Sequence, residues 1–144
     1  MWQTVYFAGF WVLLPLTFMA ALRWGGWPER TVATMYVIAA LCTLLVLTAP
    51  DRFNRIEPAL MAADIILLIG LAFVAVRSDH WWPACATALQ FLSVLAHLGK
   101  ALNPNLLRLG YQLMEQASSY PTLIVLTFGI VTHRRRTPKA ASLR

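Results

Sequence analysis

Charged side chains are scarce in this sequence. Only 12% of its 144 residues are Asp, Glu, Lys or Arg, whereas about 25% is usual in a soluble globular domain. Hydrophobic residues make up 59% of the chain, and the mean hydropathy is +0.62. This composition excludes disordered, fibrous and ordinary soluble proteins. It predicts an all-α, polytopic integral membrane helix bundle.

Cysteine is also rare. The chain has 2 cysteines, Cys42 and Cys85, each inside an apolar run. In transmembrane helices their depths would differ by roughly 10 Å at a rise of about 1.5 Å per residue, which is too far for a disulfide. We therefore expect two small core residues. The sequence has no CxxC or Cys/His ligand spacing, so it predicts no metal site and no cofactor.

Catalytic motifs are lacking as well. The sequence contains no HExxH, no GxSxG and no glycine loop of the kind that cradles phosphate. His97 lies within an apolar segment, but His80 and His133 lie near segment ends, which argues against paired axial ligands for haem. We expect a non-enzymatic protein with no catalytic residues. Topology accounts for the net charge of +6, so nucleic acid is not an expected partner.

What the chain does contain is a series of five apolar segments. They cover residues 4–22, 31–49, 58–76, 81–102 and 108–132, and glycines, prolines and charges separate them. We expect one transmembrane helical domain over 1–133, followed by a basic cytoplasmic tail over 134–144. The purely apolar part of the fifth segment, 121–131, is too short to cross alone, since a crossing needs about 20 residues. An alternative has four crossings and an interfacial helix that breaks at Pro121.

Lys and Arg divide unequally between the two ends of such a bundle. Short loops rich in these residues stay in the cytoplasm. We therefore expect a bacterial inner-membrane protein with its N-terminus outside and its C-terminus in the cytoplasm. The richer end holds Arg23, Arg30, Arg77, Arg134, Arg135, Arg136, Lys139 and Arg144, and the other end holds Arg52, Arg55, Lys100 and Arg108.

The two turns at the predicted cytoplasmic end have similar sequences. Arg23 is followed by Trp27-Pro28 after the first segment, and Arg77 is followed by Trp82-Pro83 after the third. This weak similarity suggests that the bundle consists of two related helical hairpins and a fifth helix.

Three ionisable residues lie inside the predicted crossings: Asp64, His97 and Glu115. Such residues are costly in hydrocarbon and mark candidate functional sites. All three fall in the outer half of the bundle. Gln90 and Ser93 share a helix face with His97, because the spacing is i, i+3 and i+7.

The fifth segment repeats this spacing with Gln112, Glu115 and Ser119. A short turn joins the fourth and fifth segments, so the two polar stripes should face each other or a common cavity, where Asp64 would join them. One interpretation is an outward-opening cavity that binds a proton, a cation or a polar ligand. The other is a structural network that holds the helices together.

These observations favour a binding or accessory subunit of a membrane complex. Its expected surroundings are the lipid bilayer and a membrane protein partner or a second copy of the chain. The alternative is a small proton- or cation-coupled transporter that uses the polar cluster.

Five helices, an outside start and many tryptophans resemble the architecture of the tryptophan-rich sensory protein (translocator) family, whose members bind porphyrins. Trp27-Pro28-Glu29-Arg30 departs from that family's Trp-x-Pro-Pro element. The first segment also lacks the embedded Glu of small multidrug exporters. The sequence is therefore assigned to no family, and no functional residues are carried over.

Overall fold

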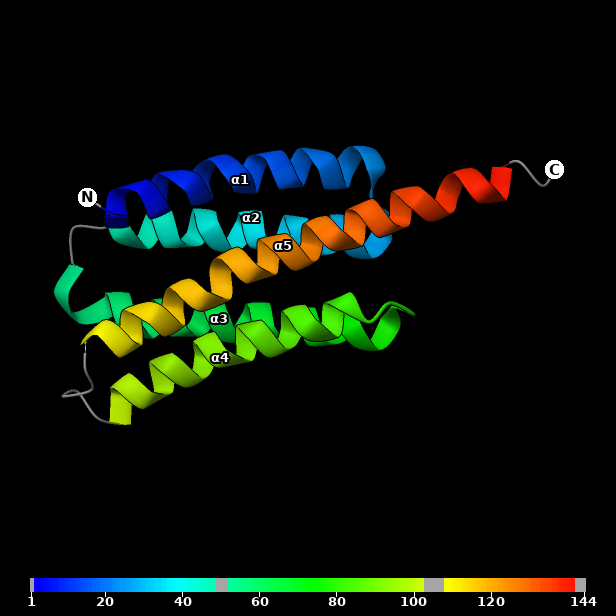
Figure 1. Cartoon of the computed structure of the whole chain (residues 1–144). Coiled ribbons are helices and arrows are strands. Elements are labelled where there is room, and N and C mark those ends of the chain that lie inside the picture. Colours follow the sequence, from blue (N-terminus) through cyan, green and yellow to red (C-terminus); the bar gives the residue numbers. More distant parts are fainter. Residues whose placement is uncertain (1, 49–51, 103–107, 142–144) are drawn as a thin grey trace.

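The computed structural model is all-helical (Figure 1). It describes residues 2–48, 52–102 and 108–141, with side chains described for 8–45, 58–99, 102 and 120–136. Within these residues the chain forms five helices and no strand. The helices are α1 (Trp2–Trp24), α2 (Trp27–Thr48), α3 (Arg52–Arg77), α4 (Trp82–Leu102) and α5 (Arg108–Ala141).

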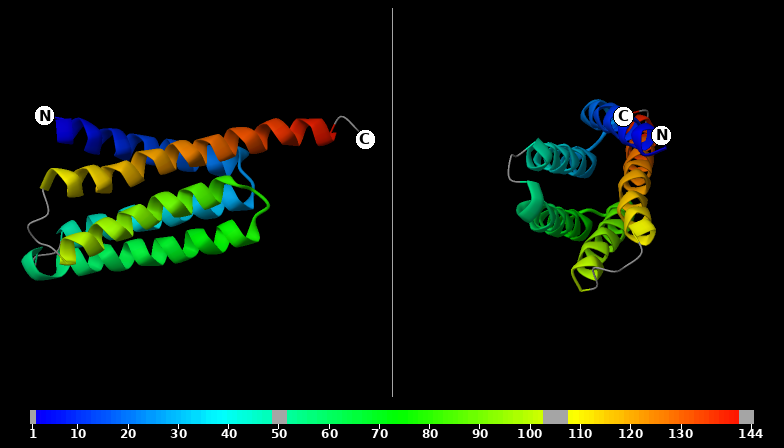
Figure 2. Two further views of the ribbon diagram at one scale, coloured as in Figure 1. Left: turned by 60° about the horizontal axis from the view of Figure 1, so that its bottom comes forward. Right: turned by 90° about the vertical axis from the view of Figure 1, so that its left-hand side faces the viewer.

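The five helices run alternately up and down and form a ring (Figure 2). Each helix packs against the next one in the chain, and α5 closes the ring by packing against α1 and touching α2. The expected antiparallel pairing of the fourth and fifth helices is confirmed. The turns after α1 and α3 and the carboxyl half of α5 therefore lie at the same end of the bundle (Figure 1).

Helix α2 begins at Trp27, earlier than the expected start at residue 31. The reason is a cap that the sequence reading missed. The Glu29 carboxylate accepts a hydrogen bond from the backbone N–H of Gly26 through Oε2, at 2.9 Å. This is the reach of a capping-box glutamate back to the N-cap residue. Pro28 is tolerated because its missing N–H lies in the first turn.

Two prolines lie inside helices where the sequence predicted a helix start or a break. Helix α3 begins at Arg52 and contains Pro58, which was the expected first residue. Helix α5 continues through Pro121 to Ala141, so the break expected at Pro121 in the alternative topology is absent. Residues 134–141 of the expected tail extend α5, because Arg, Lys and Ala favour helix and basic side chains suit a helix C-terminus.

The centre of the ring is filled by apolar side chains from all five helices. Small residues such as Ala21, Ala33 and Ala86 let the helices approach closely, and larger ones fill the space between them. The buried set is Leu14, Ala21, Val32, Ala33, Tyr36, Ala40, Leu67, Leu71, Val74, Trp82, Ala86, Leu123, Leu126 and Ile130.

One helix in the described part of the chain, Pro58–Arg77 within α3, is long and apolar enough to cross a membrane. The apolar stretch Ala8–Trp24 of α1 is shorter. Both cysteines are free, as expected, but the prediction of two core residues is wrong for Cys42. That side chain is exposed on α2, and Cys85 is partly buried on α4. The apolar run around Cys42 covers the outer as well as the inner face of α2, so sequence alone does not separate the two faces.

Candidate functional site

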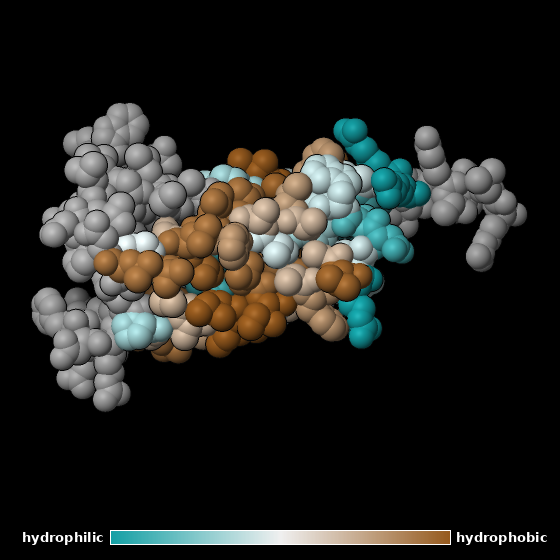
Figure 3. Space-filling view, turned by 90° about the horizontal axis from the view of Figure 1, so that it is seen from below, coloured by the Kyte–Doolittle hydropathy of each residue, from teal (hydrophilic) through white to brown (hydrophobic). Residues whose placement is uncertain are grey.

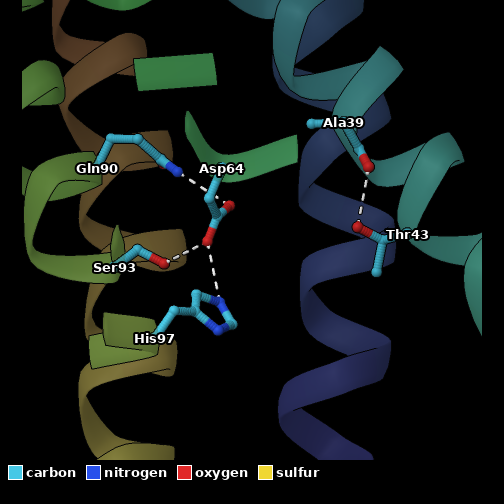
Figure 4. A network of polar contacts seen from close by, with 6 residues as sticks. All are labelled: Ala39, Thr43, Asp64, Gln90, Ser93 and His97. Atoms are coloured by element: carbon cyan, nitrogen blue, oxygen red, sulfur yellow. Dashed lines mark hydrogen bonds and ion pairs between the residues drawn. The ribbon is translucent and has the colours of Figure 1, made fainter. Parts of the chain in front are cut away.

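Asp64 of α3 is the centre of a network of polar side chains (Figure 4). Gln90 donates a hydrogen bond to Asp64 Oδ1 at 3.0 Å, and the Ser93 hydroxyl donates to Oδ2 at 2.8 Å. His97 Nε2 lies 3.1 Å from Oδ2. The structure therefore brings together four of the residues that the sequence analysis singled out.

The spacing along α4 explains this convergence. Gln90, Ser93 and His97 follow one another at i, i+3 and i+7, which places them on one face of a helix over two turns. That face meets α3, which packs directly against α4. A single carboxylate thus receives a row of three polar side chains. Thr43 is drawn nearby in Figure 4, but its hydroxyl donates to the Ala39 carbonyl of its own helix at 2.9 Å.

The remaining candidates, Gln112, Glu115 and Ser119, belong to α5. Their side chains lie outside the described residues, so the expected meeting of the two polar stripes stays a prediction.

The Asp64 network is buried on the α4 side and partly open on the α3 side. The side chain of His97 is 7% exposed and that of Asp64 is 24% exposed, while Gln90 and Ser93 are buried. A carboxylate next to an imidazole is able to exchange a proton or hold a cation. The same three contacts also give the Asp64 carboxylate hydrogen-bond partners on α4, so the network is equally able to serve as a structural link between α3 and α4.

A second group of polar side chains lies at the other end of the bundle. It joins Glu29 at the start of α2, His80 in the turn between α3 and α4, and His133 on α5. Each offers a ligand-type atom, and these atoms lie within 4.8 Å of one another. Trp82 Nε1 donates to Glu29 Oε1 at 3.2 Å.

Sequence reasoning missed this group because its members come from three distant segments and share no helix. One signal was present. The two turns with similar sequences contain Glu29 and His80, respectively, and were both expected at the same end as His133. In the structure, the Trp82–Glu29 hydrogen bond joins the first turns of α2 and α4, in which these two sequences end.

The chain matches no protein-family model, no curated protein and no solved structure.

Proposed function

We propose that this chain is a small, non-enzymatic, multi-pass membrane protein that acts as a binding or accessory subunit of a membrane complex. Its five helices cross the bacterial inner membrane, with the N-terminus outside and the C-terminus in the cytoplasm. Within the bundle, the Asp64 network acts as a closed polar seam between α3 and α4.

The observation that carries this proposal is the apolar outer surface of the bundle. Every helix exposes large hydrophobic side chains. On the face seen in Figure 3, hydrophobic residues cover the middle of the bundle. Monomeric soluble proteins rarely expose apolar patches larger than a few hundred Å². These side chains include Val12, Leu16 and Met19 on α1, Ile38 and Leu45 on α2, Ile66, Ile69 and Phe73 on α3, Phe91 and Leu95 on α4, and Ile124 and Phe128 on α5.

Six threonine hydroxyls on this surface and beneath it are satisfied within their own helices. Threonine side chains on four helices donate to the carbonyl one turn earlier, at 2.7 to 2.9 Å. In hydrocarbon there is no water to accept a hydrogen bond from the hydroxyl, so an acceptor within the protein is needed. The residues are Thr17, Thr31, Thr34, Thr43, Thr87 and Thr127.

Charged and aromatic residues at one end support the orientation. Hydrophilic residues gather at the end of the bundle where α5 has its carboxyl terminus (Figure 3). The guanidinium of Arg134 lies over the ring of Trp24, 4.7 Å from its centroid. Trp24, Trp27 and Trp81 are exposed here, as is typical of an aromatic belt beside a basic cytoplasmic face.

The seam is tested by the access of water to Ser93. The Ser93→Cys variant, with Cys42→Ser and Cys85→Ser, changes one oxygen to sulfur within the network. We expect no reaction with a membrane-impermeant maleimide added from outside, while a matched Asn105→Cys control in the predicted outer turn reacts. Rapid labelling of the cysteine at position 93 would contradict a closed seam.

The second candidate function is a proton- or cation-coupled transporter. The observation that favours it is the 24% exposure of the Asp64 side chain beside His97, because a transport site must be reached by its ion. This alternative predicts that vesicles containing the wild-type chain collapse an imposed proton gradient and that Asp64→Asn abolishes this flux. The accessory function predicts no flux from either protein.

A further inference from the structure

We propose that Glu29, His80 and His133 form a binding site for a divalent transition metal, with Zn²⁺ as the best-fitting ion. The site lies at the arginine-rich end of the bundle, away from the Asp64 network. It does not depend on the function proposed above.

The donor set is the first argument. Two imidazole nitrogens and one carboxylate oxygen are typical zinc ligands, and three protein ligands leave a fourth position for water or a further group. The donor atoms lie within 4.8 Å of one another. Tetrahedral zinc with bonds of about 2.0–2.2 Å needs ligands roughly 3.4 Å apart, so small side-chain rotations would close the site.

Glu29 is held in place as a ligand would be. The residue is 0% exposed, and each carboxylate oxygen accepts one hydrogen bond, Oε2 from the Gly26 N–H and Oε1 from Trp82 Nε1. A carboxylate offers about four lone-pair positions, so the oxygens retain capacity for a cation. Ligating carboxylates are commonly oriented by such outer hydrogen bonds.

His80 supplies an independent observation. Its Nδ1 atom is buried and makes no hydrogen bond. A buried polar atom without a partner is uncommon and calls for an explanation, of which an ion is one. A metal bound beside Glu29 would satisfy this nitrogen.

Gly26 gives His133 room beside the carboxylate. A Cβ atom at Gly26 would lie 2.8 Å from His133 Cε1 and 3.2 Å from Glu29 Oε2. The imidazole of His133 and the carboxylate of Glu29 therefore both lie against the same glycine. The metal would link the start of α2, the turn before α4 and the body of α5 at this end of the bundle.

The test is zinc binding by the full chain in detergent, purified without a histidine tag and stripped with a chelator. Competition with a chromophoric zinc indicator should show one Zn²⁺ per chain. We expect His80→Gln and His133→Gln each to weaken binding at least tenfold. His97→Gln is the matched control, because it removes the remaining histidine from the other cluster, and it should leave zinc affinity unchanged.

Two further variants leave all three ligands in place. Trp82→Phe removes the hydrogen bond to Glu29. We expect a loss of zinc affinity of about 10–100-fold, which is typical when a residue that orients a metal ligand is replaced. Gly26→Ala should displace His133 and weaken binding as well. Zinc should also raise the melting temperature of the wild type and of His97→Gln but not of His80→Gln.

Wild-type protein that binds no zinc saturably would overturn the proposal, as would equal losses of affinity in His97→Gln and His80→Gln. Glu29 would then cap α2 and accept the hydrogen bond from Trp82 without binding a metal.

Discussion

At the scale of single residues, Asp64 is an acidic side chain that depends on its polar partners, because it is only 24% exposed. Its carboxylate lies in the apolar stretch of α3 that follows Pro58 and accepts hydrogen bonds from Gln90 and Ser93, with His97 beside it. Removing one partner from such a network leaves donors or acceptors unsatisfied, which costs more than the bond itself contributes. Asp64 therefore matters to folding under either proposed function.

We predict that Asp64→Asn lowers the free energy of unfolding by about 2 kcal/mol, since the new amide group would face donors in place of an acceptor. Ser93→Ala should cost about 1 kcal/mol. Asp79→Asn is the matched control, because Asp79 is exposed in the turn after α3 and should change stability by less than about 0.5 kcal/mol. Unfolding of the purified chain in detergent measures all three. Equal stability of Asp64→Asn and Asp79→Asn would show that the network contributes nothing to the fold.

Sequence alone predicted the part of the polar cluster that joins α3 and α4, whereas the part expected from Gln112, Glu115 and Ser119 lies outside the described side chains. The spacing of Gln90, Ser93 and His97 defines one helix face, and an acid in an apolar run needs such a face to satisfy it. The group at Glu29, His80 and His133 was not predictable in this way, because no periodicity relates three segments that meet only through the ring closure by α5. The spacing of ligands along the chain carries information only when they share an element.

At the scale of elements, composition located all five helices but misplaced several of their ends. Prolines and charges marked the apolar limits of each segment, whereas a helix continues as long as its backbone hydrogen bonds can be made. Glu29 extends α2 toward its N-terminus by capping Gly26. The basic residues extend α5 because they are good helix formers.

Two glycines test how tightly the helices pack. A Cβ at Gly129 of α5 would lie 2.8 Å from Trp82 Cε2, and one at Gly70 of α3 would lie 2.9 Å from Met35 Cε. The Trp82 ring is buried and hydrogen-bonded to Glu29, so its displacement would cost more than that of the flexible end of Met35.

We therefore predict that Gly129→Ala destabilises the chain by about 1–3 kcal/mol through overpacking. Gly70→Ala should be neutral or should stabilise by up to about 1 kcal/mol, since alanine favours helix over glycine. Thermal unfolding in detergent compares the two variants. A larger loss for Gly70→Ala than for Gly129→Ala would mean that the α4–α5 contact is looser than the structure indicates.

At the scale of the whole molecule, the bundle has an apolar interior, an apolar outer surface and arginines at one end. Each helix carries apolar side chains on its outer face as well as on its inner face, so the sequence pattern does not separate the two. Cys42 was expected in the core for this reason but is exposed. We propose that lipid covers this outer surface. A crossing bundle and a water-exposed bundle differ most in the surroundings of an exposed residue at mid-helix.

Cys42 is such a residue, since it is exposed on α2 within an apolar stretch. The decisive measurement is its reaction with a charged maleimide in native membranes, opened so that both faces are accessible, in a Cys85→Ser background. We predict that Cys42 stays unmodified until the membranes are dissolved and the protein is denatured. The controls are Asn105→Cys and Ser142→Cys, each in Cys42→Ser, Cys85→Ser protein, and we expect them to react from outside and from inside, respectively. Rapid modification of Cys42 in intact native protein would contradict the multi-pass membrane assignment.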